Sequence, residues 1–186
     1  MNLPQVRRGV AAGVGVLLLA ACSILPASDV KLDAPYVSTP YEVVAEMLSM
    51  AKVGPGDVLY DLGCGDGRIV IAAAQRFGTR GVGIDIDPRR VADATAAALS
   101  AGVADRVRFL RQDLFETDFS EASVVTLYLF PELNARLRPK LLSLKPGTRI
   151  VSHDFGIGDW PPERIERVTA NGATHQLMLW TVPPRR

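Results

Sequence analysis

A glycine-rich turn constrains the fold of this chain more than any other feature of its sequence. The turn spans residues 61–67, with the sequence DLGCGDG, and directly follows the short apolar run 58–62. An apolar run bounded by turn residues is typical of a buried parallel strand. In open α/β sheets ligands bind at the carboxyl ends of such strands, where glycines allow a sharp turn and close backbone approach. The turn therefore predicts both a parallel sheet and a ligand site.

The rest of the chain repeats the alternation of apolar runs and helical patterns. Residues 39–42 (TPYE) have the form of a capping box and predict the start of a first helix. Residues 165–169 and 176–182 face each other across residues 171–172 (NG), which is a hairpin signal. The pattern indicates a doubly wound α/β domain with a mostly parallel sheet and an antiparallel edge. Further strands are expected at 81–86, 107–110, 123–129 and 149–152, and helices at 68–77, 88–101 and 131–144, the last interrupted by Pro139.

The spacing of the glycines distinguishes between two classes of ligand. Gly63, Gly65 and Gly67 follow the pattern G-x-G-x-G. A dinucleotide site needs G-x-G-x-x-G, which would place a glycine where Arg68 stands. Asp61 also puts a carboxylate beside the turn, where it would repel a pyrophosphate but would suit the ammonium of a methionyl group. The turn therefore argues against a nicotinamide dinucleotide.

An acidic residue, Asp85, ends the second expected strand, a place where carboxylates accept hydrogen bonds from ribose hydroxyls. Together, segments 58–67, 81–87 and 107–114 resemble the successive motifs of class I S-adenosylmethionine-dependent methyltransferases. The resemblance implies a Rossmann-like seven-stranded sheet of order 3-2-1-4-5-7-6, with an antiparallel last strand, and S-adenosyl-L-methionine as cofactor. The implied cofactor contacts are Asp61, Gly63 and Gly65 at the methionyl end, Cys64 and Gly67 elsewhere in the turn, Asp85 at the ribose, and Ile86, Asp113 and Leu114 around the adenine.

A narrower resemblance concerns the methyl acceptor. Residues 36–40, 63–74 and 113–114 are similar to the protein-lysine methyltransferases that act on the c-subunit of ATP synthase and to their bacterial relatives. This similarity covers residues 36–160 and implies a protein lysine as the acceptor. The chain departs from that family at Asp85, where those enzymes more often carry glutamate.

The acceptor is expected to enter where the fourth strand ends, which makes Tyr128 and Phe130 the candidate catalytic residues. Residues 128–131 (YLFP) lack the Asn/Asp-Pro-Pro-Tyr/Phe signature of methylation on adenine or glutamine amino groups, which argues against those acceptors. Two alternatives to a protein-lysine enzyme stay open: a small-molecule methyltransferase and a non-catalytic nucleoside-binding lipoprotein.

For several other reactive side chains the sequence favours a structural role or leaves the role open. His153 and Asp154 follow the fifth strand, where they would act either in proton transfer or as a hydrogen-bonded loop, and His175 is interpreted as a surface residue. Cys64 is interpreted as a small residue that fits the turn rather than as a nucleophile. The tyrosines within residues 36–41 are candidates to cover the cofactor. Since no group of cysteines, histidines and acids has metal-ligand spacing in the sequence, no metal is expected.

The N-terminus has the pattern of an export signal. Arg7 and Arg8 precede the apolar stretch 10–21, and the sequence Leu-Ala-Ala leads to Cys22. This arrangement resembles the signal of bacterial lipoproteins, in which the cysteine is lipidated. The stretch is short for a helix that crosses a bilayer core of ~30 Å. We expect an export segment at 1–21, a tether at 22–35 and a methyltransferase domain at 36–186, anchored in the bacterial cell envelope through lipidated Cys22, with an uncleaved N-terminal membrane anchor as the alternative.

The charge balance bears on the partners of the chain. Twenty-one basic and 20 acidic residues among 186 give a formal net charge of +1. Nucleic-acid-binding domains usually carry a strong basic excess, so no nucleic-acid partner is expected. The expected partners are a protein substrate or a small-molecule acceptor, together with the membrane that holds the lipid anchor.

Overall fold

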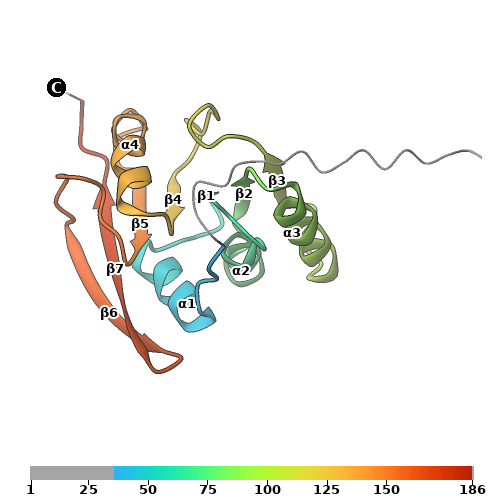
Figure 1. Cartoon of the computed structure of the whole chain (residues 1–186). Coiled ribbons are helices and arrows are strands. Elements are labelled where there is room, and N and C mark those ends of the chain that lie inside the picture. The colour runs from blue at the N-terminus through green and yellow to red at the C-terminus, as the bar shows by residue number, and fades with distance from the viewer. Residues whose placement is uncertain (1–35, 186) are drawn as a thin grey trace, which may run out of the picture.

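A computed structural model describes residues 36–185 of the chain (Figure 1). The expected export segment 1–21, the tether 22–35 and the lipidation site Cys22 lie outside the described residues. Within them, helices and strands alternate as the sequence predicts. The elements are α1 (Tyr41–Met50), β1 (Val58–Leu62), α2 (Arg68–Phe77), β2 (Arg80–Asp85), α3 (Pro88–Ser100), β3 (Val107–Arg111), β4 (Val124–Leu127), α4 (Pro131–Leu142), β5 (Arg149–His153), β6 (Arg164–Ala170) and β7 (Ala173–Thr181).

All seven strands form one sheet of order β3-β2-β1-β4-β5-β7-β6. The strands from β3 to β5 pair in parallel, whereas β7 is antiparallel to both of its neighbours, β5 and β6. The strand order reverses between β1 and β4, so the carboxyl ends of these two strands flank the point where open α/β sheets bind ligands. The predicted fold class, strand order and antiparallel strand are confirmed.

Helices cover both faces of the sheet because alternate residues of its strands point in opposite directions (Figure 1). On one face, Leu59 of β1 joins a core that includes residues from α1, α2 and α3. On the other, Tyr60 and Leu62 join a second core with Leu137 and other residues of α4. The central strands are buried on both sides, as expected of strands that read as continuous apolar runs.

Two expectations about helix chemistry are wrong. The N-cap of α1 is Pro40, which has no side chain able to cap the helix, and the hydroxyl of Thr39 instead lies 3.2 Å from Nδ1 of His153. The helix α4 is not interrupted at Pro139, because it continues past this residue to Leu142 although proline removes one intrahelical hydrogen bond. The helix α1 thus begins without a side-chain cap, and α4 continues through the proline that was expected to interrupt it.

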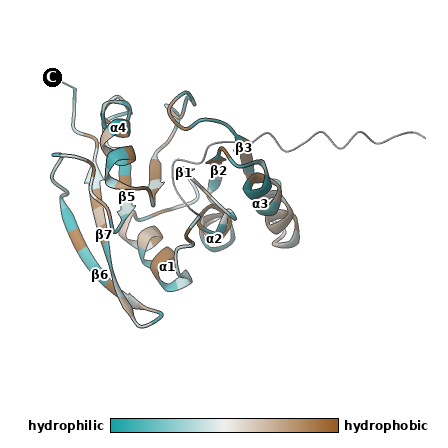
Figure 2. Cartoon of the chain, viewed as in Figure 1, coloured by the Kyte–Doolittle hydropathy of each residue, from teal (hydrophilic) through white to brown (hydrophobic). Residues whose placement is uncertain are grey.

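The C-terminal hairpin forms across residues 171–172 as predicted, with β6 at the edge of the sheet. Figure 2 shows alternating hydrophilic and hydrophobic bands along β6, which match its partly exposed position. On β7, Trp180 is fully buried and its indole N–H donates a hydrogen bond to the carbonyl of Trp160. The two tryptophans also pack on each other, with ring centroids 6.2 Å apart. Across residues 36–185, no helix is both long enough and apolar enough to cross a membrane.

Candidate active site

The glycine-rich turn after β1 holds its glycines in conformations that disfavour any other residue. Gly63, Gly65 and Gly67 have φ angles of +83°, +53° and +77°, in the left-handed region. A Cβ atom built on Gly65 would lie 2.3 Å from a ring carbon of Tyr36, and one built on Gly67 would lie 2.6 Å from the ring of Phe109. The turn therefore depends on glycine for its backbone geometry and for the close approach of two aromatic rings.

Asp85 ends β2 directly beside this turn. One of its carboxylate oxygens accepts a hydrogen bond from the Gly65 amide, and the other accepts one from the Asp87 amide, both at 2.9 Å. These two bonds hold the carboxylate in place, and each oxygen keeps a lone pair for a further donor. Asp85 is thereby positioned to accept hydrogen bonds from the hydroxyl groups of a ligand.

A cleft opens at the carboxyl ends of the strands, in two adjoining parts. The outer part encloses about 810 Å³ with its open mouth included, which is within the usual size of a small-molecule site. The inner part reaches from the first residues of the described chain to Asp61 and the start of α2. Both parts are lined by Tyr36, Val37, Gly63 and Tyr128.

Most of the predicted cofactor residues come together in this cleft. Within the described chain, Gly65 and Gly67 lie outside the lining of both parts, and they act through the shape of the turn. Asp85, Ile86, Asp113 and Leu114 line the outer part, Asp61 and Cys64 line the inner part, and Gly63 lines both.

Sequence reasoning did not identify several of the lining residues. Gln112 and Phe115 flank the predicted pair 113–114 and belong to the outer part of the cleft, as do Arg90 and Leu133. The position of Gln112 and Phe115 directly after β3 was an available signal, since loops after strands line this end of the sheet. Arg90 on α3 and Leu133 on α4 come from helices, and no sequence signal marks them.

Asp61 lies at the bottom of the inner part of the cleft, with only 3% of its surface exposed. One of its carboxylate oxygens accepts a hydrogen bond of 2.7 Å from the hydroxyl of Thr126 on β4. Burial raises the pKa of the Asp61 carboxyl to about 7, against the lowering effect of Thr126, and the charges of Asp85 and Asp66 raise it further. A cationic group of a ligand would favour the ionised form of this carboxyl.

The residues before α1 form a strap across the glycine-rich turn. Arg68 holds the strap, since its guanidinium donates a hydrogen bond of 2.9 Å to the carbonyl of Thr39 and pairs with Asp66. The ring of Tyr36 lies against Gly65, as the short Cβ distance there shows, and the guanidinium of Arg90 lies 4.2 Å from the ring centroid of Tyr36. The strap therefore brings Tyr36 to the cleft, whereas Tyr41 is exposed and does not line it.

Aromatic side chains gather where β4 ends. Tyr128 lines both parts of the cleft, and its ring stacks on His153 with centroids 3.8 Å apart. Phe155 contacts both Tyr128 and Phe130, with centroid distances of 6.2 and 6.0 Å. Phe130 is 40% exposed and lies beside the lining of the cleft rather than in it, within the described part of the chain. The two predicted acceptor residues thus sit at the mouth, one inside the cleft and one on its rim.

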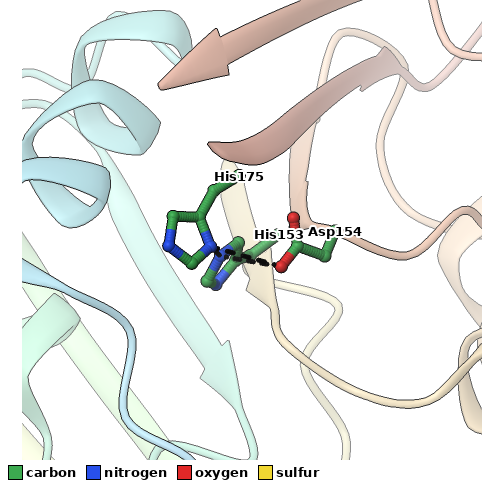
Figure 3. A group of neighbouring side chains, drawn as sticks. All are labelled: His153, Asp154 and His175. Carbon is green, nitrogen blue, oxygen red and sulfur yellow. Dashed lines mark hydrogen bonds and ion pairs between the residues drawn. The ribbon is translucent and has the colours of Figure 1, made fainter. Parts of the chain in front are cut away.

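Behind Tyr128, three polar side chains meet between β5 and β7 (Figure 3). Nε2 of His153 lies 2.9 Å from Nδ1 of His175, and Oδ2 of Asp154 lies 3.3 Å from both of these nitrogens. The interpretation of His175 as a surface residue is wrong, because its side chain is only 15% exposed and belongs to this cluster. Burial lowers the pKa of His153 to about 4, against the raising effect of Asp154, so its imidazole is neutral.

Cys64 is buried, and its sulfur packs against β2. A Cβ atom built on Gly83 would lie 2.7 Å from the sulfur of Cys64, which shows how closely the thiol approaches that strand. Burial raises the pKa of the Cys64 thiol, and the nearby Asp61 raises it further. A thiol that stays protonated is a poor nucleophile, so the geometry favours a packing role.

The cleft fits S-adenosylmethionine. Its inner part offers the Asp61 carboxylate to a cationic methionyl group, and Asp85 faces a site for ribose hydroxyls. Ile86 and Leu114 add apolar surface beside Asp85, which suits an adenine ring. These assignments of individual contacts are those that the sequence resemblance implies, and the geometry of the cleft is compatible with them.

Comparisons with known proteins agree with the cofactor that the cleft fits. A family model described as the ANTKMT methyltransferase domain matches residues 61–164. The chain is 45% identical to a protein-lysine N-methyltransferase of Saccharolobus islandicus over 80% of this chain and 93% of that protein. It is 34% identical to the ATP synthase c-subunit lysine N-methyltransferase of Xenopus laevis, over 86% of this chain and 71% of that protein.

Among solved structures, the chain resembles one described as an RNA methyltransferase of Salinibacter ruber in complex with S-adenosyl-L-homocysteine. The two are 54% identical with a TM-score of 0.75, over 81% of this chain and 96% of that one. These relatives confirm the cofactor and the enzyme class, and they give no support to a small-molecule acceptor or to a non-catalytic nucleoside-binding lipoprotein. The chain is therefore an S-adenosylmethionine-dependent methyltransferase of class I, and it belongs to the ANTKMT methyltransferase domain family, together with the ATP synthase c-subunit lysine methyltransferases.

Proposed function

We propose that this enzyme transfers the methyl group of S-adenosylmethionine to the side-chain amine of a lysine in a protein. The names of its relatives point to two macromolecular acceptors, protein lysine in one group and RNA in the Salinibacter ruber structure. The charge around the cleft favours the first of these. Its lining includes two arginines, Arg68 and Arg90, but five acids, Asp61, Asp66, Asp85, Asp87 and Asp113.

This acidic lining is the observation on which the proposal depends. An acid-rich cleft attracts the cationic side chain of lysine, whereas it repels the phosphates of an RNA strand. Arg68 is paired with Asp66 and turned toward the strap, so this pair adds little net charge and leaves the other four acids against Arg90. The guanidinium of Arg90 lies over the ring of Tyr36.

The rim of the cleft suits a protein partner. Tyr36, Val37, Ile86 and Phe130 are among the few large apolar residues that the described surface exposes, and all four lie in or beside the cleft. Clustered exposed apolar side chains are typical of protein interaction sites. A substrate segment could dock on this rim while its lysine enters between Tyr128 and Phe130.

The reaction requires mainly that the lysine amine be positioned and desolvated. When bound, the cofactor supplies a methyl group on a sulfonium, which the amine nitrogen takes as the carbon–sulfur bond breaks and sulfur keeps the electron pair. The rings of Tyr128, Phe130 and Phe155 surround the approach with apolar surface. Such surroundings lower the pKa of a lysine amine, so that it loses its proton to solvent before transfer, and they hold the nitrogen in line with the methyl carbon.

The acceptor class can be tested with methyl-labelled cofactor. The purified full-length protein is incubated with a bacterial lysate, and the labelled lysate is then treated with ribonuclease or with protease. We expect the label to survive ribonuclease and to become soluble after protease. Asp85→Ala serves as the control for dependence on the cofactor site, since it should lower the methyl label in every fraction of the lysate. Label that ribonuclease releases, or label on a small molecule, would refute the lysine acceptor while leaving the enzyme class intact.

For the location of the enzyme, we propose a lipid anchor on Cys22 that holds it in the bacterial cell envelope. Support comes from the sequence alone: Arg7 and Arg8, the apolar stretch 10–21 and the small residues before the cysteine. The wild-type protein should then sediment with membranes, and Cys22→Ser should accumulate as an unprocessed precursor. A mature soluble product from Cys22→Ser would contradict the lipid anchor, and a Cys22→Ser chain of unchanged size and membrane content would favour the uncleaved anchor.

A further inference from the structure

In the cluster of His153, Asp154 and His175, hydrogen bonds among the three side chains do not account for all three short distances. Its three facing atoms form a closed triangle, with edges of 2.9 Å between the two imidazole nitrogens and 3.3 Å from each nitrogen to the carboxylate oxygen (Figure 3). The side chains come from β5, from the residue after it and from β7, so pairing of the two strands brings them together.

Hydrogen bonds alone leave one edge of this triangle unsatisfied. With the Asp154 carboxylate ionised, only the two nitrogens can carry a proton toward the centre. If one nitrogen carries it, the lone pair of the other faces the carboxylate at 3.3 Å. If both carry one, two N–H groups point at each other across 2.9 Å. Two acceptor atoms that face each other without a proton between them repel, and a cation bound beside them would remove that repulsion.

We propose that these three side chains bind a single divalent transition-metal ion of the zinc type. Two imidazole nitrogens and one carboxylate oxygen are a common ligand set for such ions. Zinc holds its ligand atoms at about 2.0–2.2 Å, which places neighbouring ligand atoms roughly 3.0–3.5 Å apart. The edges of the triangle, 2.9 and 3.3 Å, lie at this spacing. One ion a little above the plane of the triangle would lie at bonding distance from all three atoms and satisfy their lone pairs at once.

The surroundings hold the ligands as a metal site requires. A histidine that binds metal through Nε2 carries its proton on Nδ1, and Nδ1 of His153 lies 3.2 Å from the hydroxyl of Thr39, which can accept it. The second oxygen of Asp154 accepts a hydrogen bond of 2.7 Å from the amide of Gln176. Asp154 has a φ angle of +60°, an uncommon conformation for a residue other than glycine, and its amide bonds the Gln176 carbonyl.

The ion would tie the antiparallel hairpin to the acceptor end of the cleft. His153 carries the ring of Tyr128 on one face, and Thr39 belongs to the strap over the glycine-rich turn. We therefore assign the ion a structural role: it fixes His153, and through it the position of Tyr128. Metal binding itself does not depend on which acceptor the enzyme uses.

The test measures metal binding directly. The full-length protein is stripped with chelator, dialysed and titrated with Zn²⁺ or Co²⁺. We expect about one ion per chain, visible absorption bands of bound Co²⁺, and a rise of about 5–10 °C in the thermal midpoint at a free zinc concentration a hundredfold above the Kd. His175→Ala and Asp154→Asn should lose the ion and the bands. Thr39→Val should weaken zinc binding by about 10–100-fold, because it removes only the bond that orients His153.

Glu166→Gln is the matched control, since this acid lies on the same hairpin but outside the triangle. It should bind metal as the wild type does. Binding of S-adenosylmethionine by each variant checks that the domain is folded. A wild-type protein that binds no zinc, or equal zinc binding by wild type and His175→Ala, would overturn the proposal.

Discussion

The two ends of the cleft are built in different ways. At the cofactor end, the glycine-rich turn, Asp85 and residues 113–114 each lie at the end of a strand or shortly after it. At the acceptor end, Tyr128 stacks on His153, which in turn contacts Thr39 and His175, residues brought from opposite ends of the domain. The first end is thus local in sequence, whereas the second depends on long-range packing.

This difference separates two tasks of the enzyme. Cofactor binding relies on backbone turns and carboxylates that the rigid parallel strands hold. Methyl transfer relies in addition on aromatic rings that pack on His153, at the end of β5, and on Phe155. Variants at one end should therefore change the affinity for cofactor, and variants at the other end should change the rate of transfer.

The largest effect is expected from Phe130→Ala. Loss of this ring widens the approach of the acceptor, so methyl transfer should fall by about a hundredfold while cofactor affinity stays unchanged. Leu142→Ala is the matched control, since it removes an exposed apolar side chain from the other end of α4. Calorimetry and transfer of labelled methyl groups are compared. A loss of cofactor affinity in Phe130→Ala would show that the two ends are not separate.

Asp85→Ala probes the cofactor end. It removes a carboxylate that faces the cleft, and affinity for S-adenosylmethionine should fall by about 1–3 kcal/mol, or ~30-fold at the middle of that range. Calorimetry measures the change, with Asp105→Ala as the control because that carboxylate is exposed before β3. Equal affinities of Asp85→Ala and wild type would remove Asp85 from the site.

The pKa of Asp61, raised to about 7, makes cofactor binding depend on pH. Below that pKa the carboxyl is protonated and cannot attract the methionyl ammonium, so affinity should rise with pH, by about tenfold between pH 5.5 and pH 7. Calorimetry at several pH values gives the slope. Asp61→Asn should bind weakly at every pH and show no such slope. A slope that persists in Asp61→Asn would assign the titration to another group.

Cys64→Ala should have the smallest effect. Because the buried thiol packs against β2 and stays protonated, transfer and cofactor affinity should change by less than about twofold, with about 1 kcal/mol lost in the free energy of unfolding. Single-turnover transfer and denaturant unfolding check both values. Loss of transfer in a folded Cys64→Ala protein would instead make the thiol a participant in the reaction.

The contrast between the two ends of the cleft also explains which features could be predicted from the sequence. The bounds of β1 and α2 follow from the apolar run 58–62 and the turn after it, and the strand order follows from the resemblance that those motifs carry. Asp85, at the end of β2, and Asp113, shortly after β3, belong to the same motifs, and both line the cleft as predicted.

The acceptor end could not be predicted in this way. Thr39 looks like a helix cap and His175 like a surface residue when only their neighbours in sequence are considered. Their contacts with His153 arise from the packing of the strap and from the register of β5 with β7, in which His153 pairs with Leu177. A shift of one residue in that register would turn His175 to the other face of the sheet.

The identity of the methylated residue decides whether the enzyme acts on protein lysine. Protein labelled by the wild-type enzyme is hydrolysed to amino acids, and the labelled product is identified beside that of Phe130→Ala. We expect methyllysine from the wild type and little label from Phe130→Ala, although both bind the cofactor equally. Label on a nucleoside or a small molecule, or no transfer to any fraction by a wild-type protein that binds the cofactor, would contradict it.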